Sequence, residues 1–275
     1  MSTEFIALLP PPGDTLTPYN RNLPHTTQDA SIPSIFTEAM SIREAVFVHE
    51  QSFPLAHEFD DHDPRSFHWV VYASVSSTAY TDAGGRRSSE GSRVPVGTVR
   101  LVPPPHEAPH PGMDSSKTGP SGAEYRAGGE GGEGEGNAVR GHADEDEDVH
   151  AKARTQPLHD GSESYIKLTR LAVLAPYRRL GQASLLIDSA LGWAGAHAGQ
   201  IAPAADPTAR EAHKMATGEA ERDERWKGLV LVHAQVGVER MWAGHGFVRD
   251  EGMGVWVEDG VEHVGMWRRV PVGKV

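Results

Sequence analysis

The chain has 275 residues, 38% of them apolar, no cysteine and a formal net charge of −12. The lack of cysteine excludes disulfides, thiolate metal sites and a cysteine nucleophile, and the acidic balance argues against non-specific nucleic-acid binding. No apolar run approaches the roughly 20 residues of a membrane span, and the N-terminus lacks the basic start of a signal peptide. We expect a soluble, intracellular protein, cytoplasmic or alternatively nuclear, with one large or two small domains.

Residues 1–33 are rich in Pro, Thr and Asn, which is typical of a flexible N-terminal arm, with one short strand at Phe5–Leu9. After Pro33, apolar residues recur at spacings of four, three and four, and this pattern predicts one face of a helix that ends near Glu50. The residues of this face are Ile35, Ala39, Ile42 and Val46. The next segment, residues 57–63, is an irregular acidic loop dense in groups that accept protons.

Two alternating apolar segments, residues 67–75 and 94–102, are typical of strands. Polar segments rich in Gly, Pro or Ala interrupt the pattern, and the longest has hardly any large apolar residue to offset the entropy of ordering. We interpret three of these segments as disordered insertions within one domain of residues 34–270, followed by a short tail, residues 271–275. The insertions are residues 76–93, 103–163 and 198–224.

A strand–turn–helix organises the second half of the chain. The strand begins at Tyr165, the turn carries Gly181 and the small Ala183, and the helix runs to about His197. A glycine lets backbone N–H groups approach a ligand closely, and a helix N-terminus adds the positive end of its dipole. These residues predict an anion site, most naturally for a pyrophosphate, without distinguishing CoA from a nucleotide.

The remaining pattern completes the fold class. Residues 228–234 form a continuous apolar segment typical of a buried strand, and a short helix is expected at residues 238–244. Two strands, residues 253–258 and 263–270, flank a turn at Glu258-Asp-Gly260. The order of elements predicts an α/β fold with one central, mixed, twisted sheet flanked by helices.

The turn Arg178-Arg-Leu-Gly181-Gln-Ala183, after a strand and before a helix, resembles the signature of the Gcn5-related N-acetyltransferases. Residues 42–63, 234–247 and 258–266 are similar to the opening and the ending of the ElaA-like subgroup. The resemblance covers nearly all of the chain that we expect to be ordered. It implies a single-domain acyl-CoA N-acyltransferase fold, acetyl-CoA as cosubstrate and an amine as acceptor.

The resemblance also implies how the donor binds. Its pantetheine arm would pair with the backbone of one strand, where two parallel strands separate, and its pyrophosphate would take the amides of the turn. The implied donor-binding residues are Leu171, Ala172, Val173, Arg178, Arg179, Leu180, Gly181, Gln182, Ala183, Ser184 and Trp242.

The reaction requires proton transfer on both sides. An alkyl amine, with a pKa near ~10.4, must lose a proton before it attacks, and the acidic loop offers candidate bases. The candidates, in this loop or flanking it, are Glu50, Asp60, Asp61, Asp63 and His68. The resemblance ranks Glu50, Asp60 and Asp61 first, because in the family residues at or just after this helix end line the acceptor cleft. On the acid side, many members of the family carry a Tyr where this chain has Trp242, which donates no acidic proton. His245 or Tyr177 is the candidate replacement for this acid. The alternative for His245 is that it is only a structural residue of the turn.

Arg100 and Arg170 are expected on strands bordering the site, where a guanidinium could hold a phosphate or carboxylate. Together with His68 they are the candidate substrate contacts; structural ion pairs with the acidic loop are the alternative. We expect no metal, since His57, His62 and His68 fit no closed zinc pattern.

Three functions stay open. The first is acetylation of a primary amine on a small molecule, with an amino sugar such as glucosamine 6-phosphate favoured. The second is acetylation of a protein at a lysine or N-terminus. The third is a non-catalytic CoA-binding or interaction protein, suggested by the absent Tyr and the acidic, Gly-rich insertion. Nucleic acid and membrane are not expected as partners, whereas a homodimer is an expected assembly.

Overall fold

The computed structural model describes residues 5–76, 80–81, 87–88, 91–106, 159–202 and 225–273. Within this part of the chain, eight strands form one mixed sheet in the order β1-β2-β5-β6-β7-β10-β8, with β9 paired to β10. These strands are β1 (Ile6–Leu9), β2 (Phe67–Ser76), β5 (Gly91–Val102), β6 (Tyr165–Val173), β7 (Leu229–Gln235), β8 (Val248–Arg249), β9 (Val255–Glu258) and β10 (Val261–Arg269). The pair β6–β7 is parallel, and the other described pairs are antiparallel.

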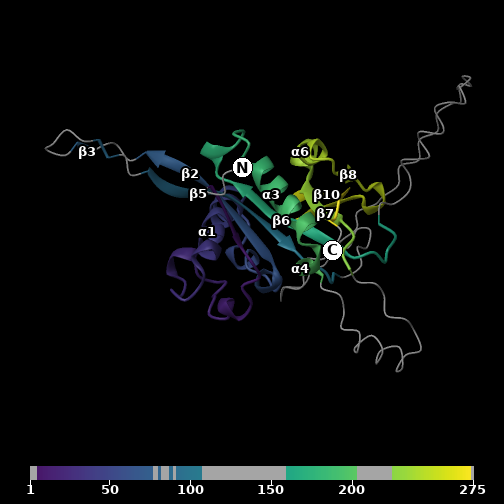
Figure 1. Cartoon of the computed structure of the whole chain (residues 1–275), viewed down its shortest axis with the longest axis horizontal. Helices are drawn as coiled ribbons and strands as arrows, with labels where there is room; N and C mark the ends of the chain where they lie inside the picture. The colour runs from purple at the N-terminus through teal and green to yellow at the C-terminus, as the bar shows by residue number, and fades with distance from the viewer. Residues whose placement is uncertain are drawn as a thin grey trace, which may run out of the picture.

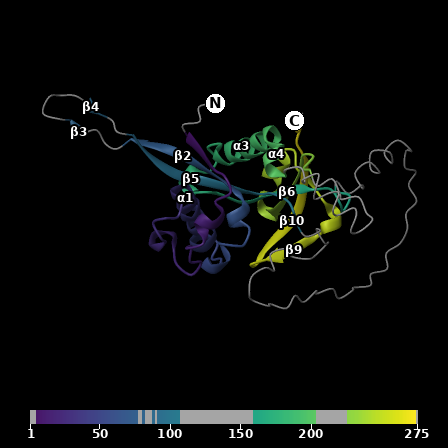
Figure 2. The same cartoon turned by 60° about the horizontal axis from the view of Figure 1, so that its bottom comes forward.

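Helices cover both faces of the sheet, α3 and α4 on one side and α1 on the other (Figures 1 and 2). The helices are α1 (Ser34–Arg43), its continuation as the π-helix η4 (Glu44–Glu50), α3 (Gln182–Ala196), α4 (Ala198–Ile201) and α6 (Glu239–Gly244). The short 3-10 turns are η2 (Gly13–Leu16), η3 (His25–Thr27), η5 (Leu55–His57), η6 (Asp63–Arg65), η7 (Ala175–Tyr177), η8 (Val236–Val238) and η9 (Glu251–Met253). The expected fold class, one mixed sheet flanked by helices, is confirmed.

A small pair of strands, β3 (Tyr80–Thr81) and β4 (Arg87–Ser88), extends beyond the ends of β2 and β5 (Figure 1). No described helix is both long enough and apolar enough to cross a membrane.

The helix α3 packs on the sheet through one apolar face. Leu186 and Ala190 are fully buried against Ile166 of β6 and Val230 of β7. Burying an aliphatic side chain of this size contributes about 1.5–3 kcal/mol. The helical spacing of these residues therefore fixes how α3, and the turn before it, lies on β6.

The helix α1 packs on the opposite face, where Ala39 and Ile42 meet Val70 and Ala172. Its last turns widen into η4, which ends at Glu50 as the spacing predicts. A π-helix is rare, and such segments are frequent at functional sites. The segment that follows η4 leads into the acidic loop, residues 57–63.

The N-terminal segment differs from the expected flexible arm. Its strand β1 pairs with β2 at the edge of the sheet, which confirms the short strand predicted there. Leu16, Tyr19 and Ile32 are buried against Phe36 of α1. These apolar residues recur with neither helical nor strand spacing, so their burial could not be predicted from periodicity. They close the core beneath α1.

Where the structure describes their flanks, the expected insertions are shorter than predicted. β2 extends to Ser76 and β5 begins at Gly91, inside the range 76–93. His159, inside the range 103–163, is 9% exposed and stacks on Trp267 with ring centroids 5.0 Å apart. Residues 107–158 lie outside the described residues, so disorder there remains a prediction.

The third insertion and the tail show the same trend. α4 occupies the first positions of the range 198–224, with Ala198 and Ile201 buried; residues 203–224 lie outside the described part. In the expected tail, the N–H of Gly273 donates to the carbonyl of Gly195 at 3.0 Å. The chain after β10 therefore packs along α3.

Candidate active site

The turn between β6 and α3 presents backbone N–H groups. Arg179 and Gly181 have φ of 63° and 82°, and this left-handed conformation is one that glycine adopts without cost. No described side chain caps the helix, whose first turn closes with the N–H of Leu185 donating to the carbonyl of Gly181 at 2.9 Å. The N–H groups of residues 182–184 therefore have no backbone acceptor among the described residues. They lie at the positive end of the helix dipole and fit an anion.

The parallel strands β6 and β7 separate before they end. Their paired residues run from Tyr165 with Leu229 to Leu168 with Val232. β6 continues for five further residues to Val173, and β7 continues to Gln235. The two strands thus part on the side of the sheet that leads into the α3 turn.

Among the described residues, the backbone of β6 has N–H groups without a strand partner on the side of this separation. The N–H of Leu174 donates to Val96 of β5 at 2.9 Å. Because N–H groups alternate sides along a strand, those of Leu171 and Val173 point away from β5, toward β7. The carbonyl of Val173 on that side accepts a hydrogen bond from Nε of Arg178 at 2.8 Å. An extended ligand with amide groups can pair with this edge as a strand does.

A β-bulge lies where β6 leaves β7. Arg100 pairs with Thr169 and Thr98 pairs with Ala172, so two residues of β6 oppose one of β5. Arg170, inside the bulge, has φ of 55°, which costs a non-glycine residue about 1–3 kcal/mol. Bulges redirect strands and are frequent next to active sites.

The predicted base Glu50 is paired with the predicted donor contact Arg178. The two guanidinium nitrogens of Arg178 each donate to a carboxylate oxygen of Glu50 at 2.6 Å. These hydrogen bonds hold the pKa of Glu50 below its usual value. The pair ties the end of η4 to the α3 turn, and a carboxylate neutralised in this way is a weak proton acceptor.

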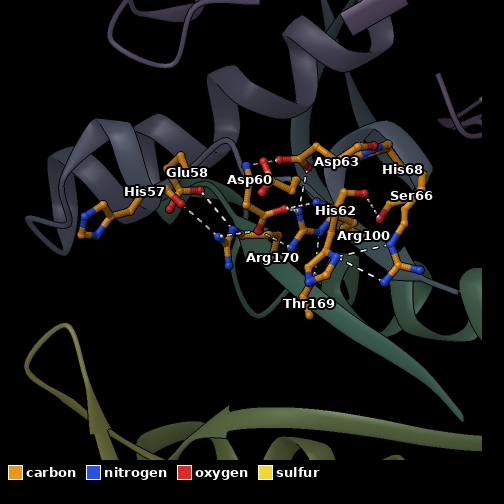
Figure 3. A network of polar contacts seen from close by, with 12 residues as sticks. His57, Glu58, Asp60, His62, Asp63, Ser66, His68, Arg100, Thr169 and Arg170 are labelled. Carbon is orange, nitrogen blue, oxygen red and sulfur yellow. Dashed lines mark hydrogen bonds and ion pairs between the residues drawn. The ribbon is translucent and has the colours of Figure 1, made fainter. Parts of the chain in front are cut away.

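The predicted base Asp60 lies in a buried network with the predicted substrate contact Arg100 (Figure 3). Arg100 is 3% exposed and donates to both oxygens of Asp60, at 2.6 and 2.8 Å. Burial raises the pKa of Asp60, but the positive charges of Arg100 and Arg170 outweigh it and hold the pKa far below its usual value. Asp60 is therefore a poor base, and Arg100 does not reach out to a substrate.

The same network continues to α1. Asp63, fully buried, lies 2.8 Å from nitrogens of both Arg43 and Arg100. Arg43 also donates from Nε to Glu58 at 3.1 Å and from Nη2 to the Glu58 carbonyl. Burial raises the pKa of Asp63, but the two guanidinium groups reverse this and lower it. The burial of Arg43 could have been predicted from the sequence, because Arg43 stands four residues after Ala39, on the apolar face of its helix.

The other predicted substrate contacts differ in exposure. Arg170 is 25% exposed and donates to the carbonyl of His57 at 3.1 Å and to Asp60 at 3.3 Å. His68 is buried, and its Nε2 lies 3.0 Å from the carbonyl oxygen of Asp63. Burial lowers the pKa of His68 to about 4, so its ring stays neutral inside the fold and does not face a substrate.

The third predicted base, Asp61, lies outside this network. Its side chain is 71% exposed and 3.7 Å from a guanidinium nitrogen of Arg21. A solvated carboxylate of this kind contributes little to the geometry of a site.

The predicted acid His245 lies beside the N-terminus of α3. Its Nε2 is 3.1 Å from Oγ of Ser184, and its Nδ1 is 3.4 Å from Asp188. These contacts place it at the anion end of the site, away from the bulge. Trp242 is 5% exposed and packs edge-on against Phe247, so it belongs to the core rather than to a donor surface.

Two contacts between distant segments of the chain were not predicted. His57, named above only as a possible metal ligand, lies with Nδ1 3.6 Å from Asp259 in the turn between β9 and β10. Gln235, at the end of β7, donates to Gln51 at 3.0 Å. Both contacts join segments about 180 to 200 residues apart, which no local pattern reveals. Among the described residues, no group of three or more His, Asp or Glu side chains is placed to hold a metal.

No protein-family profile and no curated protein matches the chain. Solved structures with a related fold include ElaA from Escherichia coli, at 15% identity and a TM-score of 0.38, covering 90% of this chain and 96% of that one. An acyl-CoA N-acyltransferase from Pseudomonas aeruginosa has 14% identity and a TM-score of 0.37, with 89% and 94% covered. The CoA-dependent acyl-homoserine lactone synthase BjaI has 13% identity and a TM-score of 0.42, with 96% and 82% covered. These values assign no roles to residues, so the roles below rest on contacts within this chain.

Proposed function

We propose that this chain transfers an acetyl group from acetyl-CoA to a primary amine of a small molecule. The observation that carries the proposal is the direct succession of two features along the chain. The part of β6 beyond its pairing with β7 leads through residues 174–181 into the amide-rich start of α3. A diphosphate followed by an amide-containing arm has the matching order of groups, and acetyl-CoA is such a donor.

The direction of the strand sets the direction of the donor. With the diphosphate at the α3 turn, the pantetheine arm runs back along β6 and pairs with the N–H groups of Leu171 and Val173. The thioester then lies near the bulge at Arg170. Because Arg170 contacts the acidic loop at His57 and Asp60, the loop lies beside the reacting carbonyl.

The reaction at this point is direct aminolysis of the thioester. A CoA thiol, with a pKa near the ~8.5 of a free thiol, is a good leaving group. The chain therefore needs no strong acid at Trp242 for turnover. What it does need is a group that takes a proton from the amine.

The acceptor is the least specified part of the proposal. An amino sugar remains a candidate, but Arg100 is held by Asp60 and Asp63, so it offers no charge to a sugar phosphate. We therefore expect glucosamine to be acetylated at least as well as glucosamine 6-phosphate. The acidic loop is equally unsuited to attract a cationic peptide, because its carboxylates contact arginines.

Release of free CoA thiol tests the proposal. The purified chain is incubated with acetyl-CoA and, separately, glucosamine, glucosamine 6-phosphate, spermidine or a lysine-containing peptide. We expect amine-dependent thiol release with at least one small amine, and acetylation of that amine by mass spectrometry. Calorimetric CoA binding without thiol release would instead support a non-catalytic CoA-binding protein. Failure to bind CoA would contradict the proposal as a whole.

A further inference from the structure

All carboxylates of the segment from the end of η4 to the start of β2 contact arginines. The contacts are Glu50 with Arg178, Glu58 with Arg43, Asp60 with Arg100, Asp61 with Arg21, and Asp63 with Arg43 and Arg100. Glu58, Asp60 and Asp63 thus point at buried arginines rather than toward a substrate, Glu50 is held by Arg178, and Asp61 is solvated away from this network.

The three histidines of this segment differ from one another. His68 is buried and bound to a backbone carbonyl. His62 is half-buried, with its Nδ1 3.2 and 3.3 Å from two nitrogens of Arg65. His57 has a side chain that is 48% exposed and contacts a carboxylate instead of an arginine. Of the three, it is the histidine that is both exposed and beside a carboxylate.

The backbone places His57 at the bulge. Its carbonyl accepts a hydrogen bond from Arg170 at 3.1 Å, and Arg170 is the residue that forms the bulge of β6. Figure 3 shows His57 at the outer end of the network, with its ring turned away from Arg100. The backbone of His57 thus lies beside the guanidinium of Arg170, and its ring lies outside the arginine-filled interior.

A second element reaches the same ring. Asp259 and Gly260 form the tip of the β9–β10 hairpin, with φ of 48° and 82°, as the favoured two-residue turn requires. Near the start of β10, His263 pairs with Gln235 at the end of β7. The hairpin tip therefore lies at the edge of the sheet where β6 and β7 separate, and Asp259 lies 3.6 Å from Nδ1 of His57.

We propose that His57 accepts the proton of the attacking amine and that Asp259 is a positioning residue, which orients the ring through Nδ1. This proposal rests on the proposed acetyltransferase function. The Asp259 contact leaves Nε2, on the other side of the ring, for the amine. The separation of 3.6 Å is an ion-pair contact rather than a hydrogen bond, and such contacts tighten in complexes with substrate.

The step balances without another reactant. The amine, as its free base, donates the nitrogen lone pair to the thioester carbonyl carbon. The C–S bond breaks, and its electron pair leaves with sulfur as the CoA thiolate. The nitrogen, now bonded to the acyl carbon, gives one proton to Nε2 of His57. The products are the amide, the thiolate and an imidazolium, which then releases its proton to the thiolate or to water.

The test compares His57→Ala with the native chain, using acetyl-CoA and the best small amine from the thiol-release panel. We expect kcat to fall about 100-fold, with the calorimetric Kd for CoA unchanged. Added imidazole should restore much of the lost rate, because the exposed site admits it. Asp259→Asn, which suits the left-handed turn, should lower kcat about tenfold without changing the KM for acetyl-CoA.

His49→Ala is the matched control, since His49 is an exposed histidine on η4; it should retain native kcat. Native kcat in His57→Ala would overturn the proposal, as would a slow variant that imidazole does not rescue. Both outcomes leave the proposed function intact as long as the native chain releases thiol. A native chain that releases no thiol with any amine removes the proposed function and this assignment together.

Discussion

The two sides of the candidate site use different chemical groups. The proposed donor side uses backbone: the N–H groups at the start of α3 and the part of β6 beyond its pairing with β7. The acceptor side uses side chains, with Arg43, Arg100 and Arg170 compensating the carboxylates of the acidic loop. Backbone groups are present in any sequence that folds correctly, whereas each buried charge depends on its partner. Substitutions should therefore affect the two sides through different quantities, donor affinity on one side and stability on the other.

The largest effect is expected from Asp63→Asn. This change removes a fully buried charge that lies 2.8 Å from Arg43 and Arg100. Breaking a buried pair leaves uncompensated charge and costs about 3–5 kcal/mol, so the midpoint of urea unfolding should fall strongly. Asp61→Asn is the control, because an exposed pair contributes at most about 1 kcal/mol. Equal midpoints for the two variants would show that the buried network does not stabilise the fold.

On the donor side, Gly181→Asp should lower CoA affinity about 100-fold, through a negative charge beside the diphosphate and a left-handed backbone that L-residues resist. No described atom lies within 4 Å of a Cβ added there, so the core should stay intact. Gly181→Asn tests the charge alone, because Asn tolerates positive φ. Calorimetry with CoA measures both variants. Similar CoA affinities of Gly181→Asp and of the native chain would show that the diphosphate binds elsewhere.

Acid should weaken the acceptor side first. Burial depresses the pKa of His68 from 6.5 to about 4, so between these values the unfolded state binds a proton that the folded state does not. From pH 7 to pH 5 this histidine alone should cost about 2 kcal/mol of stability. The lowered pKa values of Asp60 and Asp63 contribute stability that is lost only below their usual value of 3.8. The loss of unfolding free energy from pH 7 to pH 5, measured with urea, should be smaller in His68→Gln than in the native chain. An equal loss in the two proteins would contradict the assignment of this effect to His68.

The smallest effect is expected from Glu50→Gln, which weakens the link between the two sides. The Arg178–Glu50 pair is 38% and 43% exposed, so its loss should change stability by less than about 1 kcal/mol. Because Glu50 holds Arg178 rather than acting as a base, kcat should remain near native. Steady-state kinetics decide between these roles, since loss of a base would lower kcat about 100-fold or more.

The sequence was most informative where local chemistry decides structure. Gly181 and the small Ala183 after a strand predicted the turn, and the spacing of Leu186 and Ala190 predicted α3, because both depend on neighbouring residues. The mixed sheet followed from the order of elements. The turn, the helix and the sheet on this side could therefore be predicted, whereas Trp242, predicted as a donor contact, lies in the core.

The acceptor side could be predicted as a location but not as a set of roles. The position of Glu50 and Asp60 at or just after the helix end predicts them as bases, yet their arginine partners come from β5, β6 and the α3 turn. Asp259 lies about 200 residues from His57, and no period or motif links them. Whether a carboxylate is free or compensated depends on contacts between distant segments, which spacing along the chain does not encode.

Hydrogen–deuterium exchange of the native chain with and without CoA tests the central claim most directly. Binding should slow exchange at residues 180–184, where the diphosphate meets the start of α3, and at Leu171 and Val173, where the arm pairs with β6. The acidic loop should change little, since its contacts are made within the protein. Unchanged exchange at these amides in the presence of bound CoA would contradict the account.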